Sequence, residues 1–138
     1  MRRLIHALAG GLLCTLIAAP ALANPYEHKL ANGLRIIVKE DHRAPTAVHM
    51  VWYRAGSMDE TNGTTGVAHV LEHMMFKGTP KVGAGEFNRL VAAAGGRDNA
   101  FTSRDYTAYF QQVPKDRLGQ MMQLEADRMR HLNLDAKE

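Results

Sequence analysis

The sequence predicts an α+β fold in which helices pack against an antiparallel sheet. Short runs of β-branched and aromatic residues alternate with turn residues through the first half of the chain after residue 24. An Asn32-Gly33 pair stands between two of these runs and is typical of a hairpin turn. Segments with helical spacing, bounded by glycine and proline, fill most of the remainder.

Four strands are expected in order along the chain. Residues 26–30 and 34–39 form a predicted hairpin, because Asn-Gly supplies the positive φ angles that a tight two-residue loop needs. After a loop, residues 46–53 are β-branched and aromatic enough for a third strand. Residues 106–113 have the same character and predict a strand late in the chain.

Three helices are expected between and after these strands. The first surrounds residues 69–76 and ends near Gly78, and the second spans 86–94 and stops at Gly95-Gly96. The third begins at Pro114, and its apolar positions are interpreted as core filling: Leu118, Met121, Met122 and Met129. Because the first helix is apolar nearly all round, we expect it to be buried.

Residues 1–23 have the features of a secretory signal peptide. Arg2 and Arg3 precede an apolar stretch that ends in a small-x-small cleavage site at Ala21-Leu22-Ala23. Removing 23 of the 138 residues leaves 115 without cysteine, since Cys14 lies in the apolar stretch. The chain is therefore expected in the bacterial periplasm or secreted. No later segment resembles a membrane span, so no stable membrane insertion is expected after cleavage.

Charge excludes some classes of partner. All 14 acidic residues and 15 of the 17 basic residues follow residue 23, so the net charge there is 15 − 14 = +1 with histidine neutral. Such a balance predicts neither a nucleic-acid-binding protein nor a membrane-surface protein.

The motif His69-Val70-Leu71-Glu72-His73 indicates a metal site. At about 100° per residue, His73 lies about 40° round the helix axis from His69, and Glu72 lies about 60° to the other side. Two imidazoles on successive turns suit zinc, and the carboxylate is near enough to take a proton from a zinc-bound water. The alternative is a helix with two polar histidines and a solvated glutamate. The apolar neighbours weigh against it, because buried ionisable groups need a partner.

Four segments together resemble one family of peptidases. They are Arg54-Ala55-Gly56-Ser57, then the run from Gly66 to Thr79 around the motif, the run from Gly95 to Ser103, and Tyr106-Thr107-Ala108-Tyr109. From about Tyr26 to the last residue, the chain resembles the insulinase/pitrilysin family of zinc metallopeptidases. Within it, the sequence is similar to bacterial peptidases related to the mitochondrial processing peptidase β-subunit.

The resemblance implies a function for each part of the motif. H-x-x-E-H is the inverted zinc-peptidase motif, so His69 and His73 correspond to ligands of one Zn²⁺ ion and Glu72 to the general base. The segment Asn99, Ala100, Phe101 and Thr102 corresponds to the strand edge along which an extended peptide or unfolded protein lies. The activity implied is that of a zinc-dependent metalloendopeptidase, with possible pairing to a second homologous half or subunit.

One ligand of the family has no counterpart in this sequence. Family members supply a third zinc ligand from a glutamate on a later helix, beyond the residues that follow His73 here. Glu125 matches a different helix and is interpreted as a solvated residue rather than a ligand. Residues 24–138 are therefore expected to form the N-terminal, truncated part of a peptidase domain that resembles the family's N-terminal half. A non-catalytic peptide-binding or assembly subunit and a catalytically incompetent fragment remain as alternatives.

Overall fold

The computed structural model describes residues 24–135, so the predicted signal peptide lies outside the described residues. The chain divides into two compact units, residues 1–42 and residues 43–138. Within the first unit, the described part is a hairpin of two strands. The second unit holds the remaining strands, the helices and the H-x-x-E-H motif.

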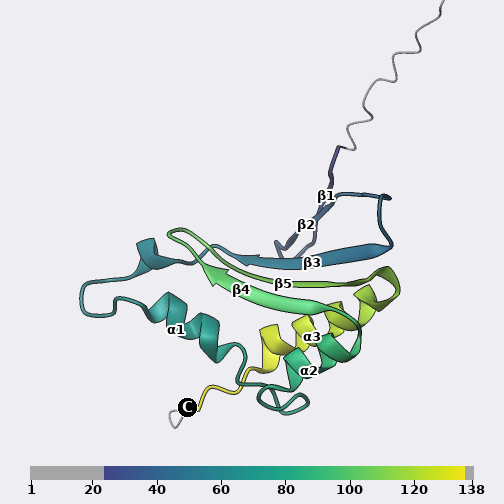
Figure 1. Ribbon diagram of the computed structural model, residues 1–138. Coiled ribbons are helices and arrows are strands. Elements are labelled where there is room, and N and C mark those ends of the chain that lie inside the picture. The colour runs from purple at the N-terminus through teal and green to yellow at the C-terminus, as the bar shows by residue number, and fades with distance from the viewer. Residues whose placement is uncertain (1–23, 136–138) are drawn as a thin grey trace, which may run out of the picture. The chain divides into compact units, whose positions relative to one another are not determined.

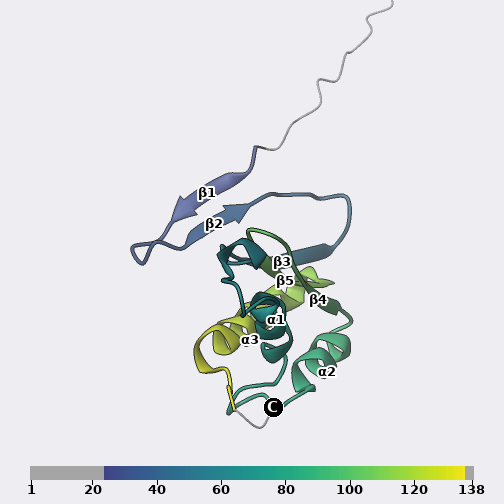
Figure 2. The ribbon, with the colours of Figure 1, turned by 90° about the vertical axis from the view of Figure 1, so that its left-hand side faces the viewer.

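The first unit contains the predicted hairpin with a different turn. Strands β1 (Tyr26–Lys29) and β2 (Arg35–Val38) pair antiparallel (Figure 2). We expected a two-residue turn with positive φ at Asn32 and Gly33, and this is wrong. Of these two residues, only Gly33 has a positive φ, at 91°. The Gly33 N–H donates to the Leu30 carbonyl. Asn32 instead accepts the Leu34 N–H on its side-chain oxygen, as in a three-residue hairpin loop.

The second unit is built on a three-stranded antiparallel sheet. Strands β3 (Thr46–Tyr53), β4 (Arg97–Thr102) and β5 (Thr107–Pro114) lie in the order β3-β5-β4 (Figure 1). Pro114, expected to open a helix, is instead the last residue of β5 and pairs with Thr46. Strand β4 lies at one edge of this sheet, as the family resemblance implies for residues 99–102.

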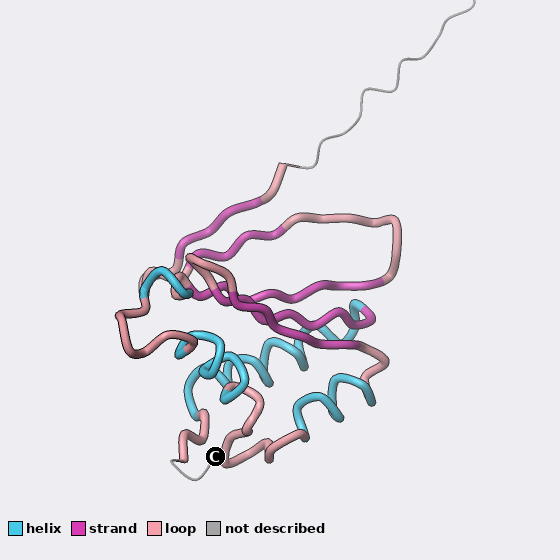
Figure 3. Tube along the Cα trace, turned by 60° about the vertical axis from the view of Figure 1, so that its left-hand side comes forward, coloured by secondary structure: helices cyan, strands magenta, loops and turns pink. Residues whose placement is uncertain are grey.

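The helices lie on one side of the three-stranded sheet (Figures 1 and 3). They are α1 (Val67–Met74), α2 (Glu86–Ala93) and α3 (Leu118–His131), so all three predicted helices are confirmed. Two short 3₁₀ helices, Ser57–Asp59 and Lys115–Arg117, precede α1 and α3. None of the helices between residues 24 and 135 is long and apolar enough to cross a membrane.

The core forms where α2 and α3 pack against β5. Its fully buried members include Val91, Tyr109, Val113 and Met121. Met121 therefore fills the core as expected. For Met122 and Met129 the same expectation is wrong, because their exposed fractions are 52% and 41% and they lie on the outer side of α3.

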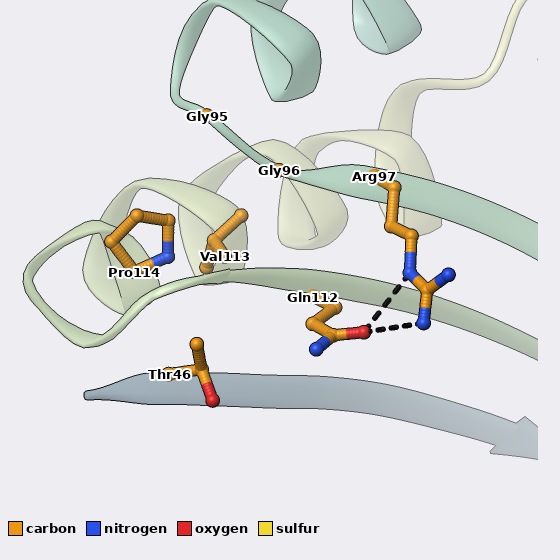
Figure 4. A pocket seen from close by; sticks show the side chains of 7 residues that line it. All are labelled: Thr46, Gly95, Gly96, Arg97, Gln112, Val113 and Pro114. Carbon is orange, nitrogen blue, oxygen red and sulfur yellow. Dashed lines mark hydrogen bonds between the residues drawn. The ribbon is translucent and has the colours of Figure 1, made fainter. Parts of the chain in front are cut away.

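A pair of glycines turns the chain from α2 into β4. Gly95 has a φ of +78°, which a residue with a side chain adopts only under strain. A Cβ on Gly96 would lie 2.4 Å from the Val113 side chain and 2.6 Å from the Gln112 carbonyl oxygen. The turn borders an open hollow of about 310 Å³ over the Thr46 end of β3, where Arg97 donates to Gln112 (Figure 4). This is the far end of β4 from Thr102, and so from the motif.

The expected burial of α1 is wrong for the described residues. No residue of α1 is buried, and the exposed fractions of Val67, Val70 and Leu71 are 54%, 61% and 49%. An apolar surface is buried only where another element covers it, and among residues 24–135 α1 packs mainly on the β4 side.

Candidate metal centre

The start of α1 is fixed by a carboxylate that lies before the helix in sequence. Glu60 accepts the Gly66 N–H on Oε2 at 2.8 Å and the Ala68 N–H on Oε1 at 3.0 Å. These two hydrogen bonds hold the pKa of Glu60 below its usual value, and the bond from Gly66 has the larger effect. Glu60 therefore satisfies two of the unpaired donors at the N-terminus of the helix that carries the motif.

The loop before α1 is anchored to the turn between β4 and β5. Ser57 N–H donates to the Ser103 carbonyl at 3.1 Å, and Met58 N–H donates to the Arg104 carbonyl at 2.7 Å. Gly56 permits this approach, because a Cβ there would lie 2.5 Å from the oxygens of both carbonyls. The two contacts bring the segment leading into α1 to the end of β4.

The two histidines of the motif face each other through the same ring nitrogen. His69 Nε2 and His73 Nε2 are 3.1 Å apart, with ring centroids 4.9 Å apart and ring planes inclined by 43°. Zinc–nitrogen bonds of about 2.05 Å in tetrahedral geometry place two ligand nitrogens roughly 3.3 Å apart. The donor pair therefore fits one metal ion held between the two imidazoles.

Glu72 is held against the sheet from the same helix. The Thr102 hydroxyl donates to Glu72 Oε2 at 2.5 Å. Beside it is a hollow of about 300 Å³, lined by Glu72, His73, Phe76, Asn88, Asp98 and Asn99. The general base expected from the sequence and one expected metal ligand thus border the same space.

The outer edge of β4 presents backbone groups that the sheet does not use. The Ser103 N–H donates to the Tyr106 carbonyl across the turn. In an antiparallel pair, residues bonded to the neighbouring strand alternate with residues whose backbone groups point outward. Counting back from Ser103, the residues of β4 that direct their backbone groups away from β5 are Thr102, Ala100 and Asp98. In agreement, the Ala100 N–H donates to the Asn99 side chain at 2.9 Å.

Three of the four residues expected to contact substrate have contacts that lie in two different places. Asn99 lines the hollow beside Glu72, and Thr102 contacts Glu72 directly. The side chain of Phe101 instead packs with Trp52 and Tyr106, at ring-centroid distances of 5.9 and 6.0 Å. Because side chains alternate along a strand, Phe101 and Thr102 lie on opposite faces of the sheet.

Glu125 is buried and paired, so its interpretation as a solvated residue is wrong. Its carboxylate accepts Arg128 Nη2 at 2.6 Å and Gln111 Nε2 at 2.9 Å, and its exposed fraction is 1%. The Arg128 guanidinium lies 4.2–5.0 Å from the ring centroids of Phe76, Phe87 and Tyr109. Glu125 is therefore a buried residue of the core, with both of its hydrogen-bond partners inside the protein.

A third ligand does not occur in the part of the chain that the structure describes. No group of three or more His, Cys, Asp or Glu side chains able to hold a metal ion occurs among residues 24–135. The roles of Glu60 and the Thr102 side chain could not be predicted from the sequence, because neither has the S/T-x-x-E spacing or another local signature.

Comparison with known proteins gives consistent matches. Residues 35–138 match the sequence profile described as Insulinase (Peptidase family M16). The chain is 40% identical over 110 residues to Zinc protease PqqE of Helicobacter pylori (strain ATCC 700392 / 26695), which covers 79% of this chain and 25% of that protein. It is also 40% identical over 98 residues to the probable mitochondrial-processing peptidase subunit beta of Arabidopsis thaliana, covering 71% of this chain and 18% of that protein.

A solved structure matches the fold. The crystal structure of a protease from Helicobacter pylori aligns with a TM-score of 0.80 and 35% sequence identity, covering 83% of this chain and 28% of that chain. In these three comparisons the chain spans 25%, 18% and 28% of the matched protein's length.

Proposed function

We propose that this chain, which belongs to the insulinase family (peptidase family M16), carries the metal-binding and proton-transfer residues of a zinc-dependent metalloendopeptidase. The observation that carries the proposal is the convergence of His69 Nε2 and His73 Nε2, 3.1 Å apart, on the helix that holds Glu72 against β4. A relative named a zinc protease supports zinc as the metal.

The residues of the motif divide the chemistry between them. His69 and His73 would hold the metal through Nε2, and neutral imidazole ligands would leave its charge undiminished. When bound, zinc supplies Lewis acidity that activates a water and polarises the peptide carbonyl. Glu72 would take a proton from the attacking water and later deliver it to the leaving amine.

The open edge of β4 is proposed as the peptide-binding element. Asp98, Ala100 and Thr102 present backbone donors and acceptors at the spacing of an added strand. An extended peptide pairing there would displace the Asn99 side chain from the Ala100 N–H. Binding through backbone groups suits substrates that are extended peptides or unfolded segments of protein.

The proposed centre needs a further ligand, and we propose that the chain pairs with a partner. Catalytic zinc sites have three protein ligands and one open position, whereas residues 24–135 supply two. We propose that the third comes from residues outside that range. One relative is named a subunit beta, which supports pairing with a second homologous half or subunit.

Two substitutions separate metal binding from proton transfer. In the full-length protein, Glu72→Gln should keep zinc and lose nearly all hydrolysis, because the amide cannot accept the proton. His73→Ala should lose both zinc and hydrolysis. Metal content by atomic emission and cleavage of a quenched peptide measure the two properties.

Exposed residues of the same types provide controls. Glu40→Gln and His42→Ala change side chains that are 73% and 88% exposed and should leave both properties intact. Unchanged turnover in Glu72→Gln would refute the proton-transfer role. A wild-type protein that binds zinc and peptide without cleaving would instead support the non-catalytic subunit.

A further inference from the structure

We infer that the Thr102 side chain is a positioning residue that orients the Glu72 carboxylate for proton transfer. The inference rests on the proposed function, because it takes Glu72 as the general base. It concerns the hydroxyl of Thr102, which is distinct from the backbone groups proposed to pair with a peptide.

The hydrogen bond between the two side chains has a defined direction. Ionised Glu72 can only accept, so the Thr102 hydroxyl donates to Oε2, at 2.5 Å. Thr107, opposite Thr102 on β5, donates its own hydroxyl proton to the Ala55 carbonyl at 2.9 Å. The Thr107 hydroxyl oxygen also lies 3.5 Å from that of Thr102, which accepts there and donates its own proton to Glu72.

Little else restrains this carboxylate among the described residues. Glu72 is half-buried, and its carboxylate borders a hollow on one side while accepting the bond from Thr102 on the other. Buried polar contacts that lock a reacting group are what give a site its productive geometry. The bond from Thr102 engages Oε2 and leaves Oε1 as the oxygen that receives the proton.

The position of Thr102 also links the base to the substrate strand. The backbone of Thr102 belongs to the open edge of β4, and its side chain lies on the opposite side of that strand's plane from Phe101, toward the helices. A peptide paired with this edge is therefore held in register with the residue that holds Glu72. Thr102 would therefore position the peptide through its backbone and orient Glu72 through its side chain.

Removing only the hydroxyl tests the inference. In the full-length zinc-loaded protein, Thr102→Val should lower kcat by roughly 10- to 100-fold, the usual effect of losing such an outer contact. KM and zinc content should stay unchanged, since neither the strand edge nor the histidines are altered. Thr102→Ser keeps the hydroxyl and should restore kcat. If Thr102→Val does not fold, Thr102→Ala can be used for the same test.

A matched control and a second readout separate positioning from general weakening. Thr79→Val removes a buried hydroxyl that donates to Asp127 on α3 and should lower the unfolding midpoint with kcat unchanged. In the zinc-free protein, Thr102→Val should lower the unfolding midpoint when it is introduced into the wild type. When it is introduced into the Glu72→Ala variant, it should cause no further decrease. This non-additivity reports the contact without any turnover.

Three results would overturn the inference: wild-type kcat in Thr102→Val, no recovery in Thr102→Ser, or additive loss of stability with Glu72→Ala. Each would be decisive only while Glu72→Gln is inactive. Activity in Glu72→Gln would refute the proposed function itself, so the two failures are distinguishable.

Discussion

Buried charge in this protein is concentrated at Arg128 and Glu125 on α3. Their side chains are 3% and 1% exposed, and the Arg128 Nη1 atom has no hydrogen-bond partner in the described part of the chain. Three aromatic rings surround the guanidinium and compensate part of its lost hydration. The pair therefore ties α3 to the ring of Phe76, which follows the motif.

Removing the arginine should strongly destabilise the fold. Arg128→Ala leaves Glu125 buried without its cation, and we expect a loss of about 3–5 kcal/mol in the free energy of unfolding. Arg130→Ala, on the exposed side of the same helix, should change it by no more than about 0.5 kcal/mol. Urea denaturation measures both, and equal effects would show that the buried pair contributes nothing particular.

Residue spacing predicts which side chains of one helix lie together, but it does not predict contacts with residues that are distant in the sequence. His69, Glu72 and His73 share a helix face by spacing alone, and the structure has the two imidazoles in contact. Glu125 was misjudged because helix patterning registers its charge but not Gln111, a distant residue on β5 that donates to its carboxylate. The contact between Thr102 and Glu72 joins residues 30 positions apart, which no local pattern predicts.

Helix α1 shows the same limit for an entire element. Its bounds followed from the glycines and the apolar run, but its burial did not, because burial requires a covering element. The hairpin turn is similar: Asn32-Gly33 correctly marked its place, while the turn geometry depended on a side-chain hydrogen bond. Strand β4 was expected only from the family resemblance, since its mixed sequence Arg-Asp-Asn-Ala-Phe-Thr lacks a strand pattern.

The N-terminus of α1 should loosen in acid. The pKa of Glu60 is lowered in the folded state from a reference value of 4.5, so its stabilisation is complete above that value. It is lost as the pH falls through the lower, folded value. Hydrogen exchange measured by NMR should show protection of the Gly66 and Ala68 amides decreasing over that range.

A second capping carboxylate supplies the control. Glu86 accepts the Gly83 N–H before α2, and that bond lowers its pKa in the same way. Glu60→Gln should reduce protection at α1 and abolish its acid dependence there, while Glu86→Gln should affect only the start of α2. Acid dependence at α1 that persists in Glu60→Gln would assign the effect to another group.

For the whole molecule, the α+β class and the family membership expected from the sequence are confirmed. Export through residues 1–23 and a periplasmic location stay predictions, because those residues lie outside the described part. A third metal ligand could not be predicted, because no side chain among residues 24–135 joins His69 and His73 in a group of three able to hold a metal ion. The chain spans 25%, 18% and 28% of the length of the matched proteins.

Locating the metal is the most direct test of the proposed centre. Crystals of the full-length protein grown with zinc, measured at the zinc absorption edge, should show one anomalous peak about 2.0–2.1 Å from Nε2 of both His69 and His73. Glu72 should lie outside the first coordination sphere, and a third ligand should come from outside residues 24–135. A peak remote from these two nitrogens, or one bonded to Glu72 as a ligand, would contradict the proposed site.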